Sequence, residues 1–278
     1  MLTRILSGIV GIAIAAAVIQ TGGAVFCAAV IALMMIGWHE YAKAFSHAGQ
    51  PVAYVSGMAA MLLLGGAACT EQSAFFLAAA LLAILWVLAL SVFRHRSFSV
   101  PQAAASVAGI AYVGFTPSHL IFLRMPFFSW WSVDTPLGKM EIGCVWLWVA
   151  LIGTWASDTF AYFTGITWGR HRLCEAISPK KSIEGFVGGL AGTAATVAAL
   201  GAVLSWPILP MAALGVAIAL LATVGDLVES AIKRYAGIKD SGVLIPGHGG
   251  VLDRFDSVMF VVPFVHYVSW FISLLLIN

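Results

Sequence analysis

Long apolar stretches recur along the whole chain and are separated mostly by short polar segments. A helix of about 20 apolar residues matches the hydrocarbon core of a bilayer, which is about 30 Å thick. By this measure the pattern predicts nine membrane-spanning helices. They cover about residues 4–20, 23–41, 52–69, 73–92, 102–123, 142–165, 186–205, 208–228 and 257–277. The pattern therefore predicts an all-α polytopic integral membrane protein.

The composition agrees with this pattern. The 278 residues are 61% hydrophobic, their mean hydropathy is +0.99, and only 9% are Asp, Glu, Lys or Arg. Such a composition excludes a soluble globular domain as the main part of the chain. The four cysteines are scattered without paired spacing, which predicts neither a disulfide framework nor a zinc site.

The positions of the basic residues predict the orientation, because cytoplasmic loops of membrane proteins carry an excess of Lys and Arg. With nine spans and a cytoplasmic amino terminus, only Arg124 and Lys139 lie outside. The basic residues inside are Arg4, Lys43, Arg94, Arg96, Arg170, Arg172, Lys180, Lys181, Lys233, Arg234, Lys239 and Arg254. We therefore expect a bacterial-type inner (plasma) membrane protein with its carboxyl terminus outside. The first helix, which follows Arg4, could alternatively be a cleaved signal peptide.

Acidic residues are concentrated in the second half of the chain, where eight of the twelve lie at or after Asp158. We expect residues 1–141 to form an N-terminal membrane region of about five spans with an external loop at 124–141. Residues 142–278 would then form a catalytic region of about four spans with two polar cytoplasmic loops. These loops are residues 166–185 and 229–256.

The strongest chemical signal flanks the second of these loops. Four polar residues share one helix face by their spacing of i, i+3, i+4 and i+7, namely Asp226, Glu229, Ser230 and Lys233. Asp253 and Asp256 are three residues apart and share a face at the start of the next helix. Carboxylates that face one point repel one another unless a cation lies between them, and hard oxygen donors suit Mg²⁺. We therefore assign Asp226, Asp253 and Asp256 as the principal metal ligands.

The loop between these two helices carries groups that suit phosphate. Glycines such as Gly249 and Gly250 allow several backbone N–H groups to point at one anion, and His248 adds a donor. The basic residues that can hold further phosphate oxygens are Lys233, Arg234 and Lys239. Metal-binding carboxylates beside cations predict a site for a polyphosphate such as a nucleoside triphosphate, and without a Walker motif it is not a P-loop enzyme. The alternative is a juxtamembrane patch of ion pairs and anchoring charges.

Two further segments carry candidate residues. Asp158 lies within a predicted span, where an ionisable side chain is costly; it is a weaker candidate metal ligand, and helix–helix hydrogen bonding is its alternative role. Lys180, Lys181 and Ser182 precede a predicted helix and could hold a phosphate at its amino terminus. Anchoring at the membrane surface is the alternative for the two lysines. The glycines that follow have a spacing that favours close helix packing, at Gly185, Gly188, Gly189 and Gly192.

The chain contains the complete pattern S-x-x-K-R-x4-K-D-x5-P-G-H-G-G-x-x-D-R-x-D, from Ser230 to Asp256. This pattern resembles the signature of the phosphatidate cytidylyltransferase family, also called CDP-diacylglycerol synthases. The upstream stretches "GDLVES" and "SPKKSIEG" resemble the same family, with Ser182 at a position where Thr is expected. These motifs lie within residues 158–256, while the first five spans match the family only in character.

The resemblance implies that CTP and phosphatidic acid react to give CDP-diacylglycerol and pyrophosphate, with one or two divalent cations such as Mg²⁺. It implies catalytic roles for Asp226, Lys239, Asp240, Asp253 and Asp256. It implies substrate binding by Lys180, Lys181, Ser182, Ser230, Lys233, Arg234, His248, Gly249, Gly250 and Arg254. The expected partners are the two substrates and the lipid bilayer, with a homodimer as a candidate assembly and no nucleic acid.

Two other classes of protein fit parts of the pattern. A CTP-dependent polyprenol or lipid kinase would transfer the γ-phosphoryl group to an alcohol, but it would need a base for the hydroxyl group, and the complete signature argues against it. A transporter or channel would have ionisable residues spread through the bilayer midplane, whereas here nearly all lie at one edge. The sequence also shows no internal repeat of the kind that many transporters have.

Overall fold

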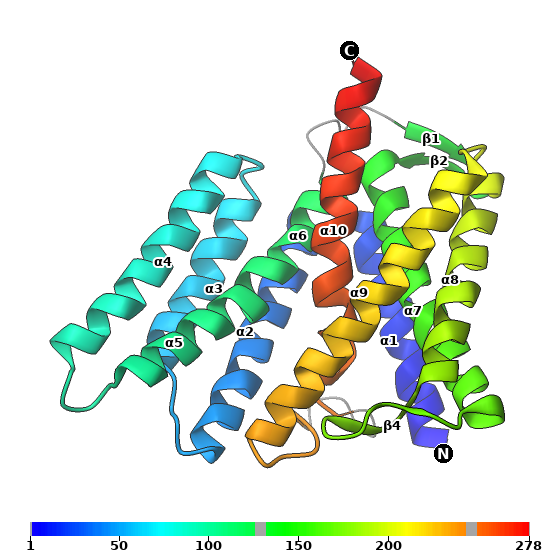
Figure 1. Cartoon of the computed structure of the whole chain (residues 1–278). Coiled ribbons are helices and arrows are strands. Elements are labelled where there is room, and N and C mark those ends of the chain that lie inside the picture. The colour runs from blue at the N-terminus through cyan, green and yellow to red at the C-terminus, as the bar shows by residue number, and fades with distance from the viewer. Residues whose placement is uncertain (1, 126–131, 243–248, 278) are drawn as a thin grey trace. The chain divides into compact units, whose positions relative to one another are not determined.

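The computed structural model of the chain describes residues 2–125, 132–242 and 249–277. Most of these residues are helical (Figure 1). The helices are α1 (Leu2–Thr21), α2 (Gly23–His47), α3 (Tyr54–Ala68), α4 (Ser73–Phe93), α5 (Val100–Gly109), α6 (Thr116–Arg124), α7 (Ile142–Trp168), α8 (Ile183–Val203), α9 (Ile208–Tyr235) and α10 (Leu252–Ile277). The π-helical turn η1 (Ile110–Phe115) joins α5 to α6. Eight of the nine predicted spans each coincide with one helix, and the fifth coincides with α5, η1 and α6 together.

The predicted class, a helical integral membrane protein, is confirmed. Within the described ranges, seven helices are long and apolar enough to cross a membrane. The apolar helix α3, Tyr54–Ala68, is shorter. At 1.5 Å per residue, α3 is about 22 Å long, which is less than the hydrocarbon core of about 30 Å. The count of nine spans and the sides on which the two termini lie stay predictions, and Asn278 lies outside the described residues.

Two polar connections form antiparallel hairpins that the hydrophobic pattern did not predict. They lie in segments that were expected to be loops, residues 124–141 and 166–185. The strands are β1 (Ser132–Thr135) with β2 (Gly138–Glu141), and β3 (Arg172–Cys174) with β4 (Ser178–Ser182). Strands of three to five residues are too short to show a clear alternation of apolar and polar positions, so the sequence does not distinguish them from loops.

The chain forms two compact units. Unit 1 contains residues 1–127 and 232–255, and unit 2 contains residues 128–231 and 256–278. Helices α9 and α10 contribute residues to both units, whereas α1 to α6 belong to unit 1 and α7 and α8 belong to unit 2. The predicted regions 1–141 and 142–278 were defined by their expected roles and not by their contacts, so the two compact units do not test them. That division stays a prediction.

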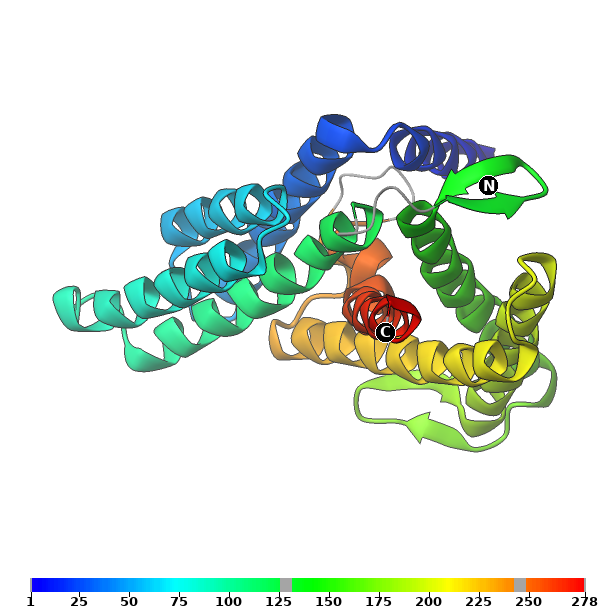
Figure 2. The same ribbon diagram turned by 90° about the horizontal axis from the view of Figure 1, so that it is seen from above.

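In unit 1, α2 packs on α3, and α3 packs on α4 (Figures 1 and 2). Two glycines of α3 allow this close approach, because the fully buried Trp38 of α2 lies against Gly57 and Ile31 lies against Gly65. The indole N–H of Trp38 also donates a hydrogen bond to the carbonyl oxygen of Tyr54 at 2.9 Å. Close contacts and hydrogen bonds of this kind hold membrane helices together, since lipid is as apolar as their side chains.

In unit 2, α7 and α8 pack against each other (Figure 1). The glycines of α8 face side chains of α7, with Gly188 against Thr164 and Gly192 against Phe160. This confirms the packing role predicted for the glycine series. Gly215 of α9 lies so close to α8 that an added Cβ would be 2.7 Å from the carbonyl oxygen of Thr193.

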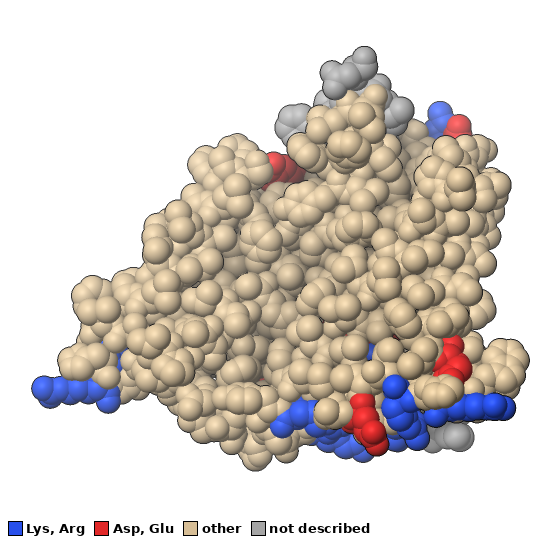
Figure 3. Space-filling model, viewed as in Figure 1, with Lys and Arg blue, Asp and Glu red and all other residues tan. Residues whose placement is uncertain are grey.

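Charged side chains gather near helix ends. On the face drawn in Figure 3, residues other than Lys, Arg, Asp and Glu cover most of the surface. The sides of the helices expose large apolar side chains, as α4 does with Leu82, Leu85 and Trp86. A soluble protein rarely exposes so much apolar surface, and contact with lipid explains it.

Candidate active site

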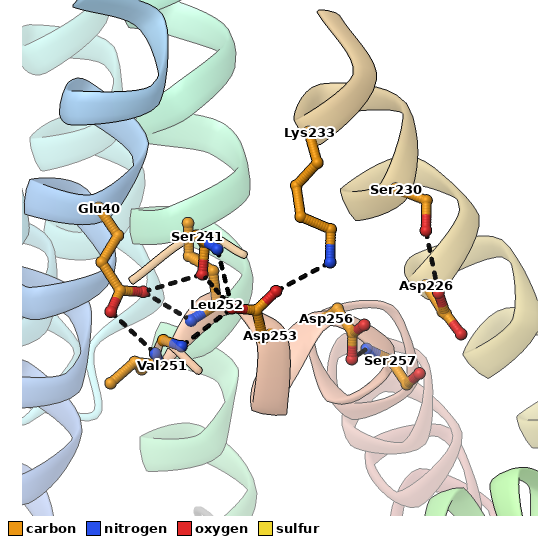
Figure 4. A network of polar contacts seen from close by, with 11 residues as sticks. Glu40, Asp226, Ser230, Lys233, Ser241, Val251, Leu252, Asp253, Asp256 and Ser257 are labelled. Carbon is orange, nitrogen blue, oxygen red and sulfur yellow. Dashed lines mark hydrogen bonds and ion pairs between the residues drawn. The ribbon is translucent and has the colours of Figure 1, made fainter. Parts of the chain in front are cut away.

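A group of polar contacts in unit 1 surrounds the carboxylate of Asp253, in the first turn of α10 (Figure 4). Lys233 of α9 forms an ion pair with it, with 2.8 Å between Nζ and Oδ1. The Oδ2 atom accepts hydrogen bonds from the N–H and the hydroxyl of Ser241, at 2.9 and 2.8 Å, and from the N–H of Gly250 at 2.9 Å. Only 6% of the Asp253 side chain is exposed. The structure therefore brings the signature residues Lys233 and Asp253 together.

A second buried carboxylate, that of Glu40 on α2, takes part in the same contacts. Its Oε1 accepts from the N–H of Val251 and its Oε2 from the N–H of Leu252, both at 2.9 Å. The Ser241 hydroxyl lies 3.3 Å from Oε2 as a further donor. The first N–H groups of a helix have no partner within it, so Glu40 caps α10 with a charge that suits the positive end of the helix dipole. We name Glu40, Lys233, Ser241 and Asp253 the carboxylate cluster.

Sequence reasoning missed Glu40. It is 201 residues away from Ser241 along the chain and lies in the half that carries no recognised motif. One signal could have found it. Glu40 is a lone acidic residue inside a predicted span, and an ionisable residue within a span was the criterion that identified Asp158 as a candidate.

Gly242 and Gly250 leave the space that Glu40 occupies. A Cβ on Gly242 would collide with Oε1 of Glu40, and a Cβ on Gly250 would lie 2.6 Å from both carboxylate oxygens of Glu40. The N–H of Gly250 donates to Asp253, and the predicted role of Gly250 in phosphate binding stays a prediction. Gly249 has a φ of +92°, which glycine adopts without strain. His248 lies outside the described residues.

Four other predicted residues of the signature are exposed to solvent. They are Arg234, Lys239, Asp240 and Arg254. Their predicted roles stay predictions.

Unit 2 contains a pocket of about 410 Å³ at the ends of α7, α8 and α9. This volume lies within the range of small-molecule sites, about 300–1,000 Å³. Five of the residues that line it are among those predicted from the sequence, namely Asp158, Lys180, Lys181, Ser182 and Asp226. Apolar side chains, including Tyr162 and Phe186, line the remainder. The structure therefore gathers residues from three separate stretches of sequence into one partly apolar, partly charged pocket.

An ion pair connects two walls of this pocket. Lys181 of β4 lies 2.6 Å from Oδ2 of Asp226 on α9, and both side chains are partly exposed. Ser230, one turn further along α9, donates to Oδ1 of Asp226 at 3.3 Å (Figure 4). Asp226 and Ser230 therefore lie together as their helical spacing predicted.

The β3–β4 hairpin is held against the start of α8. Ser182 is the N-cap of α8, and its hydroxyl oxygen accepts from the N–H of Gly185 at 3.1 Å. Glu184 accepts from the N–H of Arg170 at 3.0 Å and from Nδ1 of His171 at 2.6 Å. These contacts fix the hairpin that presents Lys180 and Lys181 to the pocket.

Helices α9 and α10 touch at Gly225 within unit 2. A Cβ on Gly225 would lie 2.5 Å from the carbonyl oxygen of Asp256 and 3.0 Å from Cα of Ser257. Two of the predicted metal ligands, Asp226 and Asp256, therefore belong to turns of α9 and α10 that are in contact. Among the described residues, no group of three or more His, Cys, Asp and Glu side chains forms a metal site. The assignment of three aspartates to the metal stays a prediction.

These features define a helical integral membrane protein with polar sites at the ends of its helices. The chain belongs to the cytidylyltransferase family, whose model matches residues 2–272. The resemblance that the signature indicated is thereby confirmed.

The curated relatives agree with the family. A phosphatidate cytidylyltransferase of Synechocystis sp. is 35% identical, over 98% of this chain and 97% of its own length. That of Bacillus subtilis is 34% identical, over 76% of this chain and 77% of its own length. The chloroplastic phosphatidate cytidylyltransferase 4 of Arabidopsis thaliana is 34% identical, over 87% of this chain and 66% of its own length.

Proposed function

We propose that this protein transfers a cytidylyl group from CTP to phosphatidate, giving CDP-diacylglycerol and pyrophosphate in phospholipid biosynthesis. The family and the named relatives support this reaction. The observation that carries it is the pocket of unit 2, which is lined by Lys180 and Lys181 and by Asp158 and Asp226. Lysines suit the phosphates of both substrates, and the apolar wall suits a lipid or a base.

The proposed chemistry needs neither a Ser nor a Cys nucleophile. An oxygen of the phosphatidate phosphate, which is ionised near neutral pH, attacks the α-phosphorus of CTP. The new P–O bond forms as the bond to the β-phosphate breaks, and pyrophosphate leaves with the electron pair. The main obstacle is repulsion between two anions, which fixed cations and alignment of the substrates overcome. We assign Lys180 and Lys181 to this neutralisation. Lys239 and Arg234 of the signature are kept as candidate phosphate-binding residues.

The donor groups of unit 2 fit a divalent cation such as Mg²⁺. Mg²⁺ is bound by one or two carboxylates and keeps its other positions for water and phosphate oxygens. Asp226 and Asp256 supply two carboxylates from helices that touch at Gly225. Bound there, Mg²⁺ would withdraw negative charge from the reacting phosphates. We keep Asp253 and Asp158 as further candidate ligands, and a homodimer as a candidate assembly.

The proposed function is tested by turnover. Purified protein in mixed micelles, supplied with CTP, phosphatidate and Mg²⁺, is expected to release pyrophosphate and form CDP-diacylglycerol in equal amounts. Both products are followed, pyrophosphate by a coupled assay and the lipid by mass spectrometry. Absence of the nucleotide-lipid product, with CTP and phosphatidate both present, would contradict the proposal.

The metal assignment predicts that Asp226→Asn and Asp256→Asn each lower kcat/KM about 100-fold or more, equivalent to about 2.7 kcal/mol of transition-state stabilisation. Asparagine keeps the size of the side chain but removes the charge that holds Mg²⁺. The Mg²⁺ concentration for half-maximal rate should therefore rise in any variant with residual activity. Asp134→Asn, the same change on the exposed strand β1, is the matched control and should behave as wild type. Full activity of both site variants at the wild-type Mg²⁺ requirement would refute the assignment.

We also propose that the site faces the cytoplasm of a bacterial-type inner membrane, because CTP is cytosolic and most basic residues are expected on that side. Ser241 is buried, so the exposed Asp240 is the better place for a reporter. In a variant with its four cysteines replaced by serine, Asp240→Cys should react with an impermeant maleimide only after the cells are permeabilised. Leu137→Cys, between β1 and β2, should react in intact cells. The opposite labelling pattern would overturn the orientation.

A further inference from the structure

We infer that Glu40 is a positioning residue of this enzyme, which holds the backbone in place at Ser241 and at the start of α10; this inference rests on the proposed function. Glu40 belongs to α2, and the relevant contacts all lie within unit 1. Its carboxylate reaches Ser241 and, at the start of α10, Val251 and Leu252. One side chain thus joins Ser241 to the start of α10.

The contacts give Glu40 this role because they go to backbone N–H groups. Val251 and Leu252 stand at the start of α10, and each N–H lies 2.9 Å from a different oxygen of Glu40. A carboxylate that accepts hydrogen bonds from two successive backbone N–H groups fixes the position and the direction of the first turn of the helix. Only 4% of Glu40 is exposed, so water does not readily replace it as acceptor.

The fixed backbone lies directly beside predicted catalytic groups. Asp240 and Lys239 precede Ser241, and Asp253 follows Leu252. Ser241 stands between the two carboxylates, because its hydroxyl lies 2.8 Å from Asp253 and 3.3 Å from Glu40. A change at Glu40 therefore moves Ser241 and, through it, the groups that we assign to substrate.

The neighbouring glycines leave room for a side chain of this length. Both Gly242 and Gly250 would place a Cβ against the Glu40 carboxylate. A glutamine at position 40 fits the same space, but its NH₂ group would face an N–H donor and leave that donor without an acceptor. Glu40→Gln thus changes the contacts while keeping the volume.

The first test is kinetic. Glu40→Gln should lower kcat/KM for cytidylyl transfer about 10- to 100-fold and raise the KM for CTP, since misplaced groups bind and align the substrate less well. Glu40→Asp keeps the charge but shortens the side chain, so its kcat/KM should lie between those of Glu40→Gln and wild type. If Glu40→Gln does not fold, Glu40→Asp serves as the test. Glu71→Gln, at an exposed glutamate, is the matched control and should match wild type.

Hydrogen exchange followed by mass spectrometry is the second test, and it does not depend on activity. In folded Glu40→Gln, peptides covering 238–242 and 249–253 should exchange at least about 10-fold faster than in wild type, while α3 and α4 stay unchanged. Unchanged exchange at these peptides, or unchanged kinetics, would overturn the inference. So would faster exchange throughout unit 1 with unaltered KM, because that result indicates a purely structural role. If wild-type protein makes no CDP-diacylglycerol, the proposed function fails, and the exchange data still decide whether Glu40 holds the backbone at these two places.

Discussion

A carboxylate can be buried at the end of a membrane helix only when donors converge on it, and this requirement organises the signature segment. Asp253 is surrounded by an ammonium group, two backbone N–H groups and a hydroxyl, and Glu40 by two N–H groups and the same hydroxyl. An unpaired charge that is buried to this extent would destabilise the fold by several kcal/mol. The chain meets this cost with Lys233 of α9, with Ser241 and with two glycines that let the backbone approach. The geometry of α10 at its start depends on these contacts.

In unit 2, donors likewise converge on polar side chains, and they do so beside a pocket that is open to ligands. Glu184 and Ser182 accept backbone N–H groups and thereby fix the hairpin, which leaves Lys180 and Lys181 at the pocket wall. Asp226 balances Lys181 while both side chains keep part of their surface exposed. Partly exposed ion pairs are weakly held, since water competes for each partner. In the proposed mechanism the pocket charges meet substrate, while the contacts of Glu40 hold the backbone at the start of α10.

Much of the helical fold could be predicted from the sequence, because apolar length is a strong signal in membrane proteins. The nine predicted stretches coincide with helices, although α3 is shorter than the predicted span over 52–69. The approach of Asp226 to Ser230 also followed from helical periodicity. In contrast, the contact between Glu40 and Ser241 joins residues 201 positions apart, and local patterns contain no information on such a pair. The hairpin that carries Lys181 was missed for the related reason that its strands are too short to show a period.

The central claim is that the α-phosphate of CTP, and not the γ-phosphate, is transferred to a lipid. The measurement that tests it most directly follows two labelled substrates in parallel, [α-³²P]CTP and [γ-³²P]CTP, with phosphatidate as acceptor. The account predicts that the α label enters the organic phase with the lipid, while the γ label stays in water as pyrophosphate. Transfer of the γ label to lipid would instead identify a CTP-dependent kinase and contradict the account.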